Sequence, residues 1–238
     1  MESWVTDRRR RPRRGPRRCP RLLAASALAL LCGCADQKKL TGPLLLHPVP
    51  PAAQGYALVQ GATVFSGPGF TVSARPWDYR LIAEEIARSG EPNPFGKSEA
   101  ATGRFLFVRV RLENRSSKSL VFNPLQATMT SEGEAPIVPV ENADLVAFAD
   151  QDLAGAEALA RVFRRLSFDL TATVPAGGTL ERYLVFPSPE KARKQIALRL
   201  GDLWLGSSSF DLIFPFESYP GAAPDPTSIE RSPQRALP

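Results

Sequence analysis

The sequence predicts a mostly β fold, an antiparallel β-sandwich of two sheets with a helical insertion at about residues 142–165 and a short helix near residues 77–88. Three observations predict it: runs of alternating apolar and polar residues recur, turn residues separate them, and only two segments have helical periodicity. The expected domain spans residues 56–216, which is long enough for one sizeable hydrophobic core.

The clearest strand is expected at residues 104–114, where every second residue is apolar. Period-two alternation is typical of a strand with one buried face. The apolar face comprises Leu106, Val108, Val110 and Leu112, and the opposite face carries Arg109 and Arg111. The polar run 114–119 is expected to form a turn, with a returning strand that begins at Leu120.

A second hairpin is expected at residues 168–186, where two alternating runs flank the turn-forming stretch 175–179. The remaining strands are predicted at residues 62–65, 70–74, 196–200 and 210–216. The first two of these flank the turn Gly67-Pro68-Gly69, and Gly206-Ser207-Ser208-Ser209 is expected to be a hairpin loop.

The two helical segments have apolar residues at intervals of three or four. Gly155 is expected to divide the longer one into two helices, with Asp150 or Asp152 near the start of the second. Phe105 and Phe107 lie on the strand face opposite the Leu/Val face, and we expect a helical segment to cover them. Left exposed, these two rings would form a patch for a partner.

Two motifs resemble immunoglobulin-like domains of poorly characterised bacterial envelope proteins. One is the strand that ends in Asn114 and is followed by Ser116; the other is the turn 174–178 followed by residues 183–187. The resemblance covers about residues 56–216 and implies an immunoglobulin-like sandwich, but these motifs are structural and carry no chemistry. A helical insertion and the lack of a cysteine pair depart from the antibody-type pattern and leave the exact topology open.

The N-terminal segment is typical of a bacterial export signal. Nine arginines lie within residues 8–21, and the apolar run 22–31 follows them. This run is too short to span a bilayer, which takes about 20 apolar residues, but it fits the core of a signal peptide. Directly after it, Leu31-Cys32-Gly33-Cys34 resembles the lipobox of bacterial lipoproteins. An ordinary secretory signal and an uncleaved anchor are the alternatives.

The lipobox resemblance implies that residues 1–33 are a signal peptide and that Cys34 becomes the first residue, acylated and held in the lipid bilayer. Residues 34–55 then form a Pro-rich tether, and residues 217–238 are expected to be a disordered tail. Ala35 follows the cysteine, and the lack of an Asp there favours the outer membrane, facing the periplasm, under the sorting rule of enteric bacteria.

Cleavage before Cys34 also changes the charge. The whole chain has 30 Lys and Arg against 24 Asp and Glu, a formal net charge of +6. Residues 34–238 retain 21 basic and 22 acidic residues, so the expected mature protein is nearly neutral. A nucleic-acid partner is therefore not expected.

Few residues could support catalysis or bind a metal. The single histidine, His47, falls in the expected tether, which cannot hold a general base rigidly beside a nucleophile. The stretch 150–155 only faintly resembles the start of a calcium-binding loop, because Ala154 and Arg161 stand where oxygen ligands are needed. No catalytic residue, cofactor or metal is therefore expected.

These observations favour a non-enzymatic envelope lipoprotein that acts as a protein-binding or accessory module of an envelope complex. An exposed sheet edge or the helical insertion would contact the partner protein, which the sequence does not identify. The arginines at a helix end could hold an anionic partner; they are Arg161, Arg164 and Arg165. The alternative is a small-molecule or glycan-binding lipoprotein with Trp77, Tyr79 and Trp204 as stacking residues. A carboxylate-based hydrolase is the third possibility, but Glu84-Glu85 and Glu132/Glu134 are too close in sequence to form its catalytic pair and are expected to be solvated.

Overall fold

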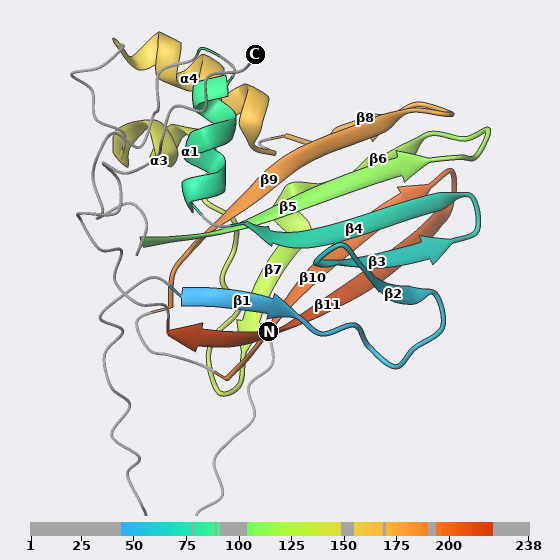
Figure 1. Ribbon diagram of the computed structural model, residues 1–238. Helices are drawn as coiled ribbons and strands as arrows, with labels where there is room; N and C mark the ends of the chain where they lie inside the picture. Colours follow the sequence, from blue (N-terminus) through green and yellow to red (C-terminus); the bar gives the residue numbers. More distant parts are fainter. Residues whose placement is uncertain are drawn as a thin grey trace, which may run out of the picture. The chain divides into compact units, whose positions relative to one another are not determined.

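Strands with one apolar face build the two layers of this protein, seen in a computed structural model (Figure 1). The structure describes residues 44–77, 79–88, 90, 104–148, 155–168, 170–189 and 194–220. Two antiparallel sheets pack face to face, so the predicted β-sandwich is confirmed.

One sheet has five strands in the order β2-β3-β4-β5-β9. Its strands are β2 (Tyr56–Val59), β3 (Ala62–Gly67), β4 (Phe70–Trp77), β5 (Phe105–Asn114) and β9 (Thr179–Pro187). The other sheet has the order β1-β11-β10-β6-β8, and β7 pairs with a second part of β10. Its strands are β1 (Leu44–Pro48), β6 (Leu120–Phe122), β7 (Ala127–Ser131), β8 (Ala172–Val174), β10 (Gln195–Leu205) and β11 (Ser208–Pro220).

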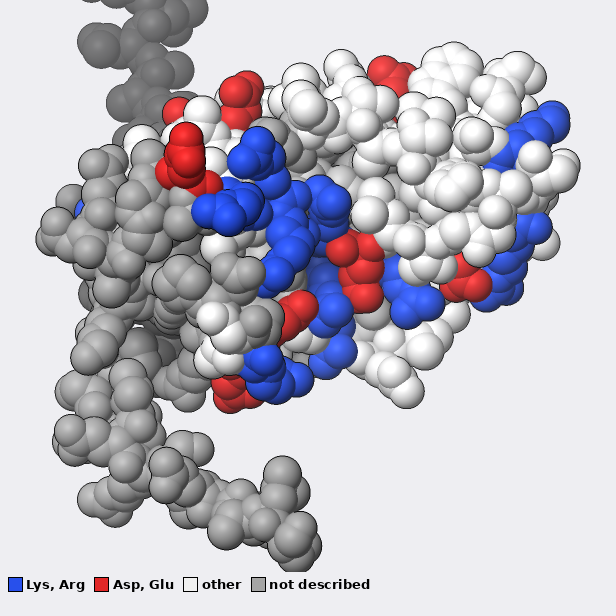
Figure 2. Space-filling model, turned by 90° about the horizontal axis from the view of Figure 1, so that it is seen from above, with Lys and Arg blue, Asp and Glu red and all other residues white. Residues whose placement is uncertain are grey.

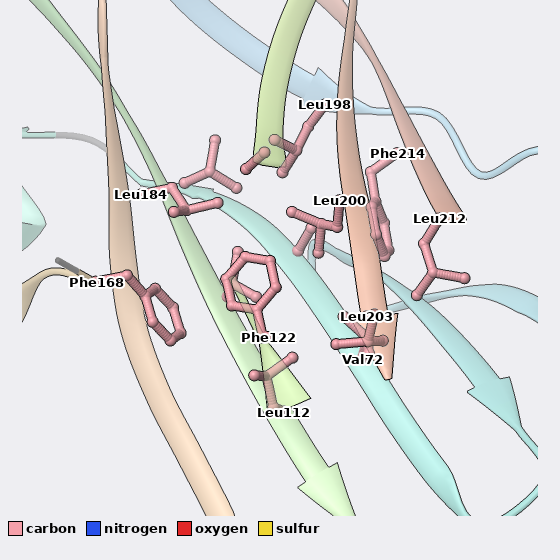
Figure 3. Packing of buried hydrophobic residues seen from close by; sticks show 14 of the residues in the cluster. Val72, Leu112, Phe122, Phe168, Leu184, Leu198, Leu200, Leu203, Leu212 and Phe214 are labelled. Atoms are coloured by element: carbon pink, nitrogen blue, oxygen red, sulfur yellow. The ribbon is translucent and has the colours of Figure 1, made fainter. Parts of the chain in front are cut away.

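The inner faces of the two sheets form the main hydrophobic core (Figure 3). The expected apolar face of β5 lies in it, and aromatic rings from the other sheet pack against that face. Residues that are fully or almost fully buried there include Val72, Leu112, Phe122, Leu198 and Phe214. Burial of each such side chain stabilises the fold by about 1.5–3 kcal/mol before entropy is counted.

The helices among the described residues are α1 (Tyr79–Arg88), α3 (Asn142–Phe148) and α4 (Gly155–Leu166), and a 3-10 turn, η1, spans Pro124–Gln126. The longer helical segment is thus two helices, as predicted, and the second begins at Gly155. Asp150 and Asp152, expected near that start, lie outside the described residues.

The helices cover one end of the outer face of the five-stranded sheet (Figure 1). A second hydrophobic cluster forms there, in which Phe105 and Phe107 are only 7% and 4% exposed. Apolar side chains from all three helices complete this cluster; they are Ile82 and Ile86 of α1, Leu145 of α3 and Phe163 of α4. The expectation that a helical segment covers the two phenylalanines is confirmed.

The predicted turns at Gly67-Pro68-Gly69 and at residues 206–209 do join paired strands, β3 with β4 and β10 with β11. The hairpins predicted across residues 114–119 and 175–179 are wrong, because the chain changes sheets at each of these two turns. β6 follows β5 in sequence but pairs with β10 and β8 in the opposite sheet. Likewise β8 pairs with β6, while β9 pairs with β5. Asn114 lies where these two crossings meet, with its side-chain nitrogen donating to the carbonyls of Lys118 and Val174. Its side-chain oxygen accepts from the amide and hydroxyl of Ser116, so the buried amide group is fully bonded.

The folded domain also begins earlier and ends later than the predicted bounds 56–216. Leu44–Pro48 forms β1, an edge strand paired with β11, and is not part of a tether. Leu44 faces the core and His47 faces outward opposite Glu217, which is the alternation of an ordinary edge strand. β11 extends to Pro220. Cys34, residues 1–43 and residues 221–238 lie outside the described residues.

No helix in the described part of the chain is both long and apolar enough to cross a membrane.

Candidate binding groove on the five-stranded sheet

A groove of about 280 Å³ lies on the outer face of the five-stranded sheet. Its polar and aromatic lining comes mainly from β4 and β5; it includes Thr71, Ser73, Arg75, Trp77, Arg109 and Arg111. Seen from above this sheet, basic side chains gather in a band with acidic side chains between them (Figure 2). We call this feature the arginine groove.

Strand alternation brings the arginines together. Arg75 of β4 lies directly opposite Arg109 of β5, and Ser73 lies opposite Arg111. Because residues two apart on a strand share a face, the three guanidinium groups project from the same side of the sheet. Like charges placed opposite each other across two strands destabilise a sheet, so this arrangement does not stabilise the fold by itself.

Trp77 supports two of these arginines. The guanidinium carbons of Arg75 and Arg109 each lie 4.7 Å from the centre of a Trp77 ring. A cation over an aromatic ring gains about 0.5–1 kcal/mol at an exposed site, and the contact restricts the arginine side chain. The indole nitrogen of Trp77 is buried and has no hydrogen-bond partner among the described residues.

Arg109 is also held by carboxylates on both sides. Its Nε lies 2.7 Å from Glu181 Oε1, and its Nη1 lies 3.7 Å from Glu85 Oε2 of α1. The hydroxyl of Tyr183 donates to the same Glu85 oxygen at 2.5 Å. Burial of the phenol, and then its hydrogen bond to the charged Glu85, raises the pKa of Tyr183 well above its usual range. This network fixes α1 against the sheet at one end of the groove.

Arg75 and Arg111 differ from Arg109, because neither forms an ion pair with any residue in the described ranges. The nearby carboxylate of Glu113 is held by Arg115 at 2.9 Å. That hydrogen bond is the largest cause that lowers the pKa of Glu113, and the charge of Arg111 contributes less. The arginine groove therefore offers two guanidinium groups without a matched anion.

The sequence-predicted aromatic residues do not come together. Trp77 lines the arginine groove, whereas Trp204 is 41% exposed on β10 of the other sheet. Tyr79 begins α1, and its side chain lies outside the described part. A binding site that stacks a sugar between two of these rings is therefore not formed by Trp77 and Trp204.

The predicted arginine cluster on α4 lies where an arginine of β9 bonds the C-terminal end of the helix. Arg182 Nη1 donates to the carbonyl of Arg164 at 2.6 Å, so a positive charge from β9 caps the C-terminus of α4. Arg164 Nε donates to the carbonyl of Ala160, within the helix. Arg161 is exposed on the same helix.

The carboxylates considered for catalysis have separate surroundings. Glu85 is bonded to Tyr183 and lies near Arg109, while Glu84 is exposed. No group of three His, Cys, Asp or Glu residues that could hold a metal occurs in the described ranges.

Sequence reasoning gave Arg75 no role, although two signals could have identified it. Arg75 and Trp77 are two residues apart and so share a strand face, and Arg109 and Arg111 do the same. The register that sets Arg75 opposite Arg109 cannot be predicted from the sequence of either strand alone.

No protein-family model matches the chain, and no curated protein matches it. Two solved structures are similar at low identity. The yjhA protein from Bacillus subtilis is 13% identical over 63% of this chain and 93% of its own, with a TM-score of 0.36. A protein from Listeria monocytogenes EGD-e, described as functionally unknown, is 14% identical over 75% of this chain and 89% of its own, with a TM-score of 0.32. These values are too low to transfer a function.

Proposed function

We propose that the protein is a lipid-anchored lipoprotein of the bacterial cell envelope whose β-sandwich is a non-enzymatic binding module. The observation that carries the anchor is Leu31-Cys32-Gly33-Cys34 directly after an arginine-rich block and a ten-residue apolar run. Acylation of Cys34 would supply the two or more chains that stable attachment to a bilayer needs.

The position of β1 supports a domain held close to the membrane. Nine residues separate Cys34 from Leu44, where β1 begins. Since an extended chain spans at most about 3.6 Å per residue, these residues reach at most ~32 Å.

The arginine groove and the neighbouring edge strand support the binding role. The outer edge of β9 already accepts backbone hydrogen bonds, from Val140 to Val185 and from Phe168 to Tyr183. The opposite edge, β2, pairs only with β3 within the described sheet and has exposed Leu58 and Val59. Val59 also lines the arginine groove, so a partner protein at this edge would reach both features.

The anchor is tested by replacing Cys34. We expect the Cys34→Ala chain to lose labelling by radioactive palmitate and to leave the membrane pellet after alkaline or high-salt washing. Cys32→Ser is the matched control, because it removes the cysteine two residues earlier and leaves the rest of the motif intact. Palmitate labelling of Cys34→Ala equal to that of the natural chain would show that the anchor is assigned wrongly.

The binding role is tested by photo-crosslinking in cells that produce the chain. A photoreactive amino acid at position 59, beside the groove, is expected to capture a discrete partner. The same amino acid at position 213, which is 49% exposed on the other sheet, is the control. Identical crosslinks from both positions, or none from position 59, would argue against a partner at the β2 edge. A small-molecule ligand, favoured by Trp77 in the groove, would then be the second candidate.

A further inference from the structure

We propose that the arginine groove binds a phosphate group, held by Arg75 and Arg111 and by the hydroxyls of Thr71 and Ser73. This inference rests on the proposed binding role of the groove, and it does not depend on the lipid anchor.

The two unpaired arginines are placed to act together. In the register of β4 and β5, Ser73 lies opposite Arg111, and Arg75 lies two residues further along β4. Diagonal neighbours across a strand pair are ~7–8 Å apart at the backbone, so the two side chains rise from neighbouring positions on one face of the sheet. An anion bound by both would offset part of the positive charge on this face.

The third arginine of the groove, Arg109, lines the proposed site without binding the phosphate. Arg109 is committed to Glu181 at 2.7 Å and lies over Trp77, so it is held in place before any ligand arrives. Arg75 lies over the same ring and is therefore also restricted, although it has no carboxylate partner in the described ranges. Side chains ordered in advance lose less entropy on binding than free ones do.

The acidic residues in the lining lie opposite two of the assigned residues, Glu113 opposite Thr71 and Glu181 opposite Arg111, but each already has another arginine as its partner. Glu181 is paired with Arg109, and Glu113 is paired with Arg115 at 2.9 Å. Their charges are thus compensated by arginines other than the two we assign to the ligand. Glu113 lowers the positive potential near Arg111 without forming an ion pair with it.

The hydroxyl groups favour phosphate over carboxylate. Thr71 and Ser73 lie on the outward face of β4 in the groove lining, and neither side chain has a hydrogen-bond partner among the described residues. A phosphate monoester carries up to two negative charges and three acceptor oxygens, which match two guanidinium groups and two hydroxyl donors. A volume of about 280 Å³ admits the phosphate with a short part of the molecule that bears it.

Binding is tested by isothermal titration calorimetry on the full-length chain in detergent micelles. The probes are inorganic phosphate, the monoester glycerol 3-phosphate, the diester glycerophosphoglycerol and acetate at equal ionic strength. We expect at least one phosphate probe to bind and acetate to bind at least about tenfold more weakly. A preference for the monoester indicates a free phosphate metabolite, and a preference for the diester indicates a lipid headgroup.

The double variant Arg75→Gln with Arg111→Gln is expected to weaken phosphate binding about tenfold or more, because each charged hydrogen bond is lost. Arg88→Gln with Arg104→Gln changes the net charge equally at exposed positions outside the groove and is expected to bind as the natural chain does. Thermal unfolding of both double variants verifies that they fold.

Absence of binding by every phosphate probe, equal binding of acetate, or equal loss in both double variants would overturn the proposal. Palmitate labelling and the crosslink from position 59 are independent readouts, so a missing phosphate site is distinguishable from a wrong anchor or partner surface.

Discussion

The side-chain nitrogen of Asn114 donates a hydrogen bond to the main-chain carbonyl of Val174, 2.9 Å away and sixty residues later in the chain. This bond joins the end of β5 to the end of β8, which belong to different sheets. The main-chain amide of Asn114 donates in addition to the carbonyl of Gly178 at 2.9 Å. The two places where the chain passes between the sheets are therefore tied together through one buried side chain.

Asn114→Ala should destabilise the protein by about 3 kcal/mol, because several buried carbonyl groups lose their donor at once. The measurement is urea unfolding followed by circular dichroism. Asn123→Ala is the matched control, since Asn123 caps η1 through a single exposed hydrogen bond to Leu125 and should cost less than about 1 kcal/mol. Equal costs for the two variants would contradict the role of Asn114.

Phe107→Ala should destabilise the protein by about 3–5 kcal/mol, because it removes a ring on which the helices pack. Hydrogen exchange measured by mass spectrometry should also increase in α1. Leu170→Ala provides the comparison, as Leu170 is 76% exposed and its loss should change unfolding by less than about 0.5 kcal/mol. Unchanged exchange in α1 would mean that the helices do not depend on this ring.

The raised pKa of Tyr183 predicts a loss of stability in alkali. A tyrosine in the unfolded chain ionises near pH 10, whereas the buried phenol beside Glu85 resists ionisation. The contribution is thus fully present below about pH 10 and is lost progressively as the pH rises above it. The free energy of unfolding, measured between pH 8 and 11, should fall less steeply in Tyr183→Phe than in the natural chain. Parallel curves for the two proteins would contradict this assignment.

Arg182→Gln should loosen the C-terminal end of α4, because it removes the cation that bonds the carbonyl of Arg164. We expect a cost of about 1 kcal/mol and faster hydrogen exchange in the last turn of α4. Arg161→Gln on the same helix is the control, because Arg161 is exposed away from this contact. The same exchange rates in the natural chain and in Arg182→Gln would show that the helix end is held by other contacts.

The sequence predicts single elements well, but it predicts the pairing of neighbouring strands at only two of four turns, those between β3 and β4 and between β10 and β11. The apolar face of β5 and the cover over Phe105 and Phe107 follow from local periodicity, and the structure confirms both. A strand, a polar turn and a second strand look alike whether the chain returns in the same sheet or crosses to the other. What decides between them is the long-range bonding of Asn114, which no local pattern contains.

Two further features, the strand β1 and the arginine groove, were not predicted from the sequence. Proline residues after Leu46 suggested a tether, although Leu44 and Leu46 already had the spacing of a strand with one buried face. An edge strand tolerates proline, because one side of its backbone needs no partner. The arginine groove likewise depends on the register that sets Arg75 against Arg109.

The pairing of Leu44 with Pro220 also has a mechanical consequence. The chain enters the sandwich and leaves it at two register partners on neighbouring strands, β1 and β11. A force that pulls Leu44 and Pro220 apart acts perpendicular to β1 and β11. It breaks the hydrogen bonds between the two strands one after another, starting from the Leu44–Pro220 end. The five paired residues of β1 would separate first, and Leu44 would leave the edge of the core with them. Tension between the two flanking segments would therefore release an edge strand before it unfolds the domain.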